Sequence, residues 1–374
     1  MFWRLQRGGQ RLLLQRRAIS TFHMDNSARG RLQPYMGAIK LVSAVAGLAM
    51  VGVGGLYVWV SRHLEATYPT PAEVTNRQTR RLLRGAALRE HIAPDPAIAY
   101  LFLLRALSQL YKDGFSERSR VVQETVVRLA AAADRMGEHA AAEQLLWDTW
   151  GVVEAAGEAD ARNDAGEADT WRDAQIARVA RVLGPLLTRR GAHERSVAVY
   201  GAAVRALERL DDDGGSGDAV RLALANAITS LGEAFALVGD CDSAEALLAS
   251  VLADIRRRPQ AAGVDAWTCL DAVVMLDLAQ VSLRAGRRDD SAAWAGSALA
   301  ATAQRRGVWA CDNCETHTLV HLGRVAEASG DRGSARVFYS RALELARRSR
   351  TGNIEQIKAC ILSISEDIRA VDAE

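Results

Sequence analysis

A recurring order of small and large apolar residues is the feature that most constrains the fold of this 374-residue chain. It is clearest in residues 319–346, where Gly323 lies in one helical stretch and Gly330 in the turn that follows. Ala335 and Tyr339 then place a small and a large residue on one face of a second stretch. Small residues let two helices approach to about 8–10 Å, and large ones fill the space beyond them. The order therefore predicts two antiparallel helices joined by a short turn.

One helix pair cannot bury its own apolar face, so further copies are expected. The same order recurs upstream, and a looser pair is expected in residues 75–111, where Asp95 and Pro96 open the second helix. Successive copies are more widely spaced than the ~34 residues of a minimal repeat, which indicates long helices or connections. The small residues that mark the first helices are Ala130, Gly184, Gly232, Ala279 and Gly323.

Composition agrees with a stack of helices. Alanine and leucine dominate after Pro96, strand-like alternation is hard to find, and later prolines occur at Pro185 and Pro259. The formal net charge of +2 produces no strong field, so no nucleic-acid partner is expected. We predict an all-α fold, an α-solenoid of about six helical hairpins over residues 75–370, preceded by one transmembrane helix. The hairpins resemble the tetratricopeptide repeat (TPR).

Residues 1–19 resemble a mitochondrial presequence. Phe2, Trp3 and several leucines alternate with arginines, and the first acidic residue is Asp25. An amphipathic, arginine-rich and acid-poor segment is typical of a transit peptide, and a disordered basic tail is the alternative. The sequence Arg-Ala-Ile-Ser ending at Ser20 resembles a processing signal, so cleavage is expected between Ile19 and Ser20.

Residues 41–60 contain no charged residue and no proline. At 1.5 Å per residue they span about 30 Å, the thickness of the hydrocarbon core of a bilayer. Tyr57 and Trp59 suit the interface between lipid and water. We therefore expect a transmembrane helix here, with residues 61–74 as a linker to the helical domain. A buried helix of a soluble protein is the alternative.

The charges on either side of this segment do not decide its orientation, because basic residues occur on both sides. If the presequence enters the matrix first and the apolar segment stops transfer, residues 20–40 form a short matrix segment. The helical domain then lies in the intermembrane space. The expected location is the mitochondrial inner membrane, with a single span.

Signatures of catalysis are missing from the sequence. It contains neither a GxxxxGK[ST] phosphate loop nor an HExxH metal motif. Acidic and basic residues are spaced as exposed ion pairs on helices, each worth a few tenths of a kcal/mol. We expect no enzymatic activity and no cofactor.

Two cysteines and two histidines close together in sequence form the one constellation that invites a chemical interpretation. Cys311 and Cys314 are followed by His317 and His321. Three alternatives are open: a Cys311–Cys314 disulfide, two free thiols, or a zinc site that also uses the histidines. The other cysteines, Cys241, Cys269 and Cys360, are expected to be small buried apolar residues.

A binding groove is the natural product of a solenoid. In TPR hairpins, first-helix residues at fixed places relative to the small marker face the concave groove. The rule predicts a mixed polar lining that could hold an extended peptide. An ordinary solvated helix face is the alternative for each residue taken singly. The residues selected are Arg178, Arg181, Asn226, Thr229, Glu233, Gln280, His317 and Arg324.

Three segments carry a closer resemblance: LLRGAALRE at residues 82–90, APDPAIAYLFLLRAL at 93–107, and CDNCETHTLVHLG at 311–323. With the presequence and the single span, they resemble the fungal mitochondrial TPR adaptor of the i-AAA protease. The resemblance implies a non-enzymatic subunit that captures unfolded or misassembled proteins and presents them to the protease hexamer for degradation. It also implies a companion membrane adaptor.

Two other scaffold roles are alternatives. A TPR scaffold or assembly factor for a respiratory-chain complex would share the same architecture. An import receptor of the outer membrane would place the solenoid in the cytosol, which conflicts with a presequence. A zinc or redox enzyme built on Cys311 and Cys314 is a more distant alternative.

Overall fold

The computed structural model describes residues 55, 59–160, 165–212, 217–257, 267–349, 354 and 357–362. The chain divides into two compact units, Met1–Pro69 and Thr70–Glu374. In the first unit, residues 59–67 form a helix in which the rings of Trp59 and His63 stack, 5.6 Å apart. The predicted presequence, the predicted matrix segment and most of the predicted span at 41–60 lie outside the described residues.

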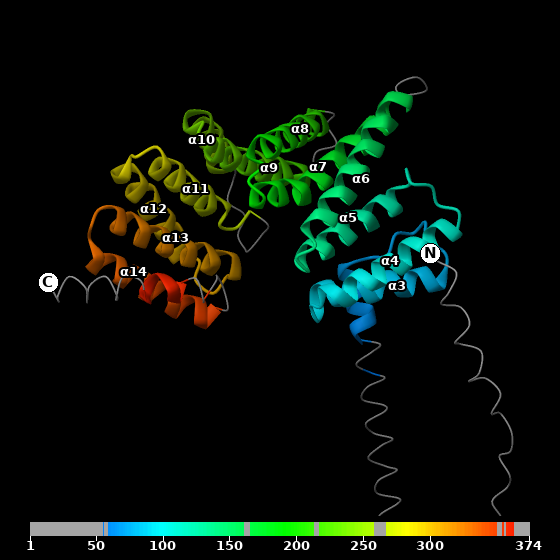
Figure 1. The fold of residues 1–374 in the computed structure, drawn as a ribbon, viewed down its shortest axis with the longest axis horizontal. Coiled ribbons are helices and arrows are strands. Elements are labelled where there is room, and N and C mark those ends of the chain that lie inside the picture. Colours follow the sequence, from blue (N-terminus) through cyan, green and yellow to red (C-terminus); the bar gives the residue numbers. More distant parts are fainter. Residues whose placement is uncertain are drawn as a thin grey trace, which may run out of the picture. The chain divides into compact units, whose positions relative to one another are not determined.

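The second unit is a series of helical hairpins, and its described part contains no strand (Figure 1). A short π-helix, Leu88–Ile92, continues the first helix of the first hairpin. All six hairpins expected from the sequence are present, which confirms the all-α, TPR-like prediction. The hairpins are α3 (Arg77–Ala87) with α4 (Pro96–Lys112), α5 (Arg120–Arg135) with α6 (His139–Asp160), α7 (Ala165–Arg189) with α8 (His193–Asp212), α9 (Asp218–Val238) with α10 (Cys241–Arg257), α11 (Leu270–Arg284) with α12 (Arg288–Ala303), and α13 (Trp309–Ala328) with α14 (Arg332–Ser349).

Each helix packs against its neighbour in the chain, as Figure 1 shows for the paired ribbons. The first helices of successive hairpins also contact one another, from α5 through α7, α9 and α11 to α13. These first helices therefore lie side by side and share one face. Solenoids commonly use an extended face of this kind for binding.

The marker glycines lie where a large side chain of the second helix crosses the first. A Cβ atom on Gly184 would lie 2.2 Å from Cζ of Tyr200, and one on Gly323 would lie 2.5 Å from Cε1 of Tyr339. Two tyrosine rings thus occupy space that any larger residue would need. The physical reason for the sequence pattern is this close approach of helix backbone and ring.

In two of the hairpins, a glycine followed by an aspartate joins the first helix to the second. Gly239 ends α9 in the left-handed region with φ of 100°, which glycine adopts without a Cβ clash. Asp240 then accepts a hydrogen bond from the Ser243 amide at 3.1 Å and so caps the start of α10. Asp331 does the same for the Ser334 amide in the last hairpin, at 2.9 Å.

Buried side chains form successive clusters along the stack. One cluster spans α5 to α8, a second spans α9 to α13, and a third lies in the last hairpin. Ile357, in the helical residues 357–362, joins the third cluster and covers the end of the stack. The interior is therefore divided among neighbouring hairpins, as expected of a solenoid.

Among the described helices, α9 is long and apolar enough to cross a bilayer by length and composition, with a mean hydropathy of 1.2 in its most apolar window. The helix packs between α8 and α10, and Leu231 and Ala234 on it are buried. These packing contacts account for the apolar character of α9 within the solenoid. The helix is therefore weak evidence for a membrane span.

Candidate functional site

A large open pocket lies on the face formed by the first helices. We call it the central pocket; its volume is about 1170 Å³, and residues of α5, α7, α8 and α9 line it. Tyr200, Leu207 and Leu210 of α8 contribute apolar surface, together with alanines from α7 and α9. The polar residues around it include Arg120, Glu124, Arg128, Arg178, Arg181, Asn226 and Ser230.

Most of the arginines at the central pocket have intramolecular partners. Glu124 accepts a hydrogen bond from Nε of Arg120 at 2.9 Å and pairs with Arg178. Burial opposes ionisation of Glu124, but the hydrogen bonds from both arginines outweigh it and hold its pKa below the usual range. Arg128 pairs with the buried Glu90. Glu124 and Glu90 balance two of these three positive charges, and each of the three guanidiniums is held by an intramolecular partner.

Arg181 is different, because it is exposed and no carboxylate in the described part of the chain pairs with it. Pro185 lies one turn further along α7 and also lines the pocket. Proline has no amide hydrogen, so it cannot donate the usual helical hydrogen bond to the Arg181 carbonyl. Arg181 thus places a cation without a paired carboxylate at the pocket, on a helix that lacks one backbone hydrogen bond at Pro185.

A second, smaller pocket lies near the end of the stack. We call it the C-terminal pocket; its volume is about 320 Å³. It is lined by α11, α13 and the helical residues 357–362. The side chains with polar groups around it are Asp277, Gln280, Asn313, Cys314, Thr316, His317, His321, Arg324 and Cys360.

Six of the eight predicted groove residues line one of these two pockets. Arg178, Arg181 and Asn226 line the central pocket. The C-terminal pocket is lined by three more, Gln280, His317 and Arg324. Whether any of them binds a peptide stays a prediction.

The two remaining predicted groove residues line neither pocket. Thr229 is 7% exposed, and its hydroxyl donates to the Ala225 carbonyl at 2.8 Å, so this hydroxyl is already engaged within α9. A threonine hydroxyl commonly turns back to the carbonyl one helical turn earlier, which removes it from the surface. Glu233 is exposed, and its carboxyl lies against that of Asp277 on α11.

Cys311 does form a disulfide, but with Cys269 and not with Cys314. Cys311 and Cys314 lie within one helix, α13, where residues three apart keep their Cβ atoms about 5–6 Å apart. A disulfide needs Cβ atoms about 3.5–4.5 Å apart, so helix geometry opposes the predicted bridge. Cys314 stays a free, buried thiol whose pKa burial raises to about 12. Cys269 is buried as predicted, but it is bridged; Cys241 and Cys360 are half-buried and free.

The zinc alternative loses a ligand, because Cys311 is oxidised. Within the residues that the structure describes, no group of three or more His, Cys, Asp or Glu is placed to hold a metal ion. His321 instead makes a structural contact: its Nε2 lies 2.8 Å from Oγ of Ser291, whose hydroxyl donates to the Ala279 carbonyl. Burial, with a smaller effect of the positive Arg324, lowers the pKa of His321 to about 4. The imidazole is therefore neutral at neutral pH.

Asp277 is the polar residue that the sequence analysis missed. It is 4% exposed, it lines the C-terminal pocket, and its Oδ2 has no hydrogen-bond donor among the residues that the structure describes. Burial raises its pKa well above the usual range, and the neighbouring Glu233 carboxyl raises it further. The available signal was a single acid inside the apolar run of residues 272–279.

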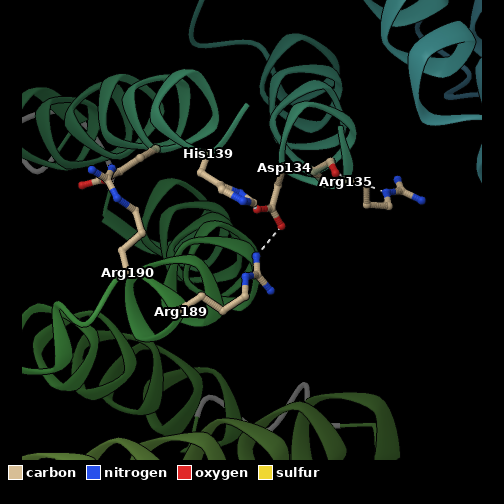
Figure 2. Close-up of polar contacts among 7 residues, drawn as sticks. Asp134, Arg135, His139, Arg189 and Arg190 are labelled. Atoms are coloured by element: carbon tan, nitrogen blue, oxygen red, sulfur yellow. Dashed lines mark hydrogen bonds and ion pairs between the residues drawn. The ribbon is translucent and has the colours of Figure 1, made fainter. Parts of the chain in front are cut away.

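The turns of the second and third hairpins carry a separate group of charges, drawn in Figure 2. Arg189 reaches Asp134, and Nδ1 of His139 lies 2.8 Å from Oδ1 of the same aspartate. Arg190 pairs in the same way with Glu143 of α6. These arginines join two hairpins and are already occupied, in contrast to Arg181.

No family model and no curated protein matches the sequence. Among solved structures, the apo form of RapI aligns with a TM-score of 0.50 at 9% identity, over 79% of this chain and 100% of that one. A Podosopora anserina kinesin light chain protein with nearly identical TPR-like repeats aligns with a TM-score of 0.44 at 15% identity, over 62% and 95%. The quorum sensor NprR from B. thuringiensis aligns with a TM-score of 0.46 at 13% identity, over 91% and 92%. At these identities the likeness concerns the fold alone, which is a TPR-like solenoid.

Proposed function

We propose that this protein is a non-enzymatic scaffold that binds an extended, unfolded segment of another protein in the central pocket. The observation that carries the proposal is the pocket itself, which is built from the first helices of three successive hairpins. TPR-like solenoids commonly use this face to bind peptides or proteins.

The size and openness of the pocket favour a polypeptide over a small molecule. Its volume of about 1170 Å³ exceeds the roughly 300–1,000 Å³ of most small-ligand sites. Apolar surface from the half-buried Val127 and Leu222 suits the side chains of an unfolded segment. The Arg181 guanidinium can donate to carbonyls or carboxylates of that segment.

We further propose that the scaffold is an adaptor of the i-AAA protease of the mitochondrial inner membrane, with a role in protein quality control. The resemblance of residues 82–90, 93–107 and 311–323 supports this role, as do the expected presequence and span. Anchoring both proteins in one membrane raises the effective concentration of a weakly bound substrate toward the millimolar range. Modest affinity in the pocket is then sufficient for delivery.

The buried disulfide supports the intermembrane space as the location of the solenoid. Structural disulfides persist in oxidising compartments and are rare in the cytosol. The Cys269–Cys311 bond therefore favours the adaptor over an import receptor that faces the cytosol. A scaffold for a respiratory-chain complex in the same space is the second candidate, because the disulfide fits it equally well.

Binding in the pocket is tested with full-length protein in detergent and a permanently unfolded, fluorescently labelled protein. Ala223 is exposed on α9 and lines the central pocket, so Ala223→Trp fills it. Ala198 on α8 is equally exposed but lies outside the pocket, so Ala198→Trp is the matched control. We expect at least a tenfold weaker affinity for Ala223→Trp alone, at unchanged melting temperature. Equal affinity of the two variants would refute pocket binding.

The adaptor role is tested separately by isolating the tagged protein from detergent-solubilised mitochondria and identifying what comes with it. We expect the i-AAA protease hexamer and a companion membrane adaptor. Recovery of a respiratory-chain complex without the protease would instead establish the second candidate. Solenoid digestion by protease in mitochondria with an intact outer membrane would establish the receptor.

A further inference from the structure

Asp277 at the C-terminal pocket has a feature that protein interiors rarely tolerate. Its side chain is almost fully buried, yet Oδ2 has no hydrogen-bond donor in the described part of the chain. Leaving a buried carboxylate ionised and without a partner is strongly destabilising. Asp277 nevertheless lines a pocket that is open to solvent, so a small movement of the lining would bring a partner to it.

We propose that the C-terminal pocket receives a positively charged side chain, lysine or arginine, of a bound polypeptide, with Asp277 as its anionic partner. The site is separate from the central pocket and does not require the role proposed there. It is lined by α11 and α13, the first helices that follow α9 in the stack.

The remaining lining suits such a side chain. Val273, Leu276, Val320 and Ile357 provide apolar walls for the methylene stem. The amide oxygens of Gln280 and Asn313 are acceptors for the remaining N–H groups of an ammonium or guanidinium. A volume of about 320 Å³ is small for a complete organic ligand and adequate for one side chain.

The adjacent carboxyl of Glu233 explains how the empty pocket stays stable. Two ionised carboxylates cannot donate hydrogen bonds to each other, so the burial of Asp277 and its closeness to Glu233 raise the pKa of Asp277 and favour its protonated form in the empty pocket. An arriving cation takes the place of that proton, which leaves to solvent. Binding therefore releases one proton and strengthens as the pH rises.

The charged and titratable groups around the pair do not oppose this exchange strongly. His321 is neutral, since its pKa is about 4, and the thiol of Cys314 is neutral as well. Arg324 is the permanent cation of the lining, and it is exposed, so water screens its charge. The groups that face the pair of Asp277 and Glu233 are Arg284 of α11, Cys314, His317, His321 and Arg324 of α13, and Cys360.

The experiment titrates full-length protein in detergent with the peptide acetyl-Ala-Ala-Lys-Ala-Ala-amide by calorimetry. The control peptide carries norleucine, which keeps the stem and lacks the charge. We expect the lysine peptide to bind at least tenfold more tightly at pH 8, to bind more weakly at pH 6, and to release about one proton. Equal binding of the two peptides, or binding without proton release, would overturn the proposal.

Two variants of the protein locate the site. Asp277→Asn keeps the shape and removes the charge, and should abolish the preference for lysine. Asp271→Asn is the matched control on the same helix, because Asp271 pairs with Arg305 and does not line the pocket. If Asp277→Asn fails to fold, Gln280→Trp, at an exposed position of the lining, blocks entry instead. Unchanged lysine preference in a folded Asp277→Asn or Gln280→Trp protein would place the site elsewhere.

The lysine peptide and the unfolded protein together distinguish binding at the C-terminal pocket from binding in the central pocket. Ala223→Trp should lose the unfolded protein and keep the lysine peptide. Asp277→Asn should lose the lysine preference and keep most of the affinity for an unfolded protein that lacks basic residues. If one of these two variants does not give its expected result, the other variant still tests the other pocket.

Discussion

Cys269 and Cys311 join the N-terminal ends of α11 and α13 through a disulfide, with Cα atoms 5.4 Å apart. Both residues are buried, and Cys269 adopts the left-handed conformation with φ of 71°, unusual for a residue other than glycine. The bond fixes the fifth hairpin to the sixth. It also sets the first prediction.

Reduction of this bond should destabilise the solenoid markedly. The disulfide closes a loop with a sequence separation of 42, for which chain entropy gives about 4 kcal/mol of stabilisation. We expect Cys269→Ser to lower the free energy of unfolding by roughly 2–5 kcal/mol, measured by urea denaturation. Cys241→Ser removes a free thiol and should change little. If the two variants had the same free energy of unfolding, both with and without reductant, the disulfide would not contribute to stability in solution.

Enlarging a marker glycine should also destabilise the fold, in proportion to the clash. Gly323→Ala places a methyl group 2.5 Å from the Tyr339 ring, which should cost about 1–3 kcal/mol. Gly296 on α12 has no atom within 4 Å of the added Cβ, so Gly296→Ala should stabilise by up to about 1 kcal/mol through helix propensity. Thermal melting followed by circular dichroism checks both. Opposite signs are expected, and two shifts of the same sign would contradict the packing described.

Acid should weaken the contact between the fifth and sixth hairpins through His321. A histidine titrates near 6.5 when unfolded, and burial lowers the pKa of His321 to about 4. Between these values the unfolded chain binds more protons, so stability is present above pH 6.5 and is lost as the pH falls toward 4. The loss from pH 7.5 to pH 5 should be roughly 2 kcal/mol.

The measurement compares urea unfolding of the wild type and His321→Gln at several pH values. Asp277 acts in the opposite sense, because an acid with a raised pKa favours the folded state as the pH falls. The difference between the two proteins isolates the histidine, since both contain Asp277. A difference that does not change with pH would mean that His321 titrates normally in the folded chain.

The hairpins were predictable because their determinants are local. Gly323 and Tyr339 belong to one hairpin, and the spacing between them is set by two helices and a short turn. Asp95 and Pro96 similarly start α4 with a side-chain cap and a proline at the first position. Such signals are complete within about thirty residues of sequence, roughly the length of one repeat.

The details of the candidate site depended on contacts between hairpins, which local patterns do not specify. Cys311 found Cys269 across a helix–helix interface, although Cys314 was nearer in sequence. Thr229 satisfies the groove rule by its position, but its hydroxyl donates a hydrogen bond to the Ala225 carbonyl in the same helix. The buried position of Asp277 could be recognised only from the residues around it, because a single acid in an apolar helix does not by itself indicate a binding site.

The division of the interior into neighbouring clusters has a consequence for how the chain comes apart. In a stack whose hairpins contact only their neighbours, the terminal pairs can fray while the middle remains folded. Unfolding then proceeds in steps, and a single melting temperature averages over them. The covalent link between α11 and α13 retains the last hairpin against this fraying, so under reducing conditions the C-terminal end should be the first part to exchange its amide hydrogens.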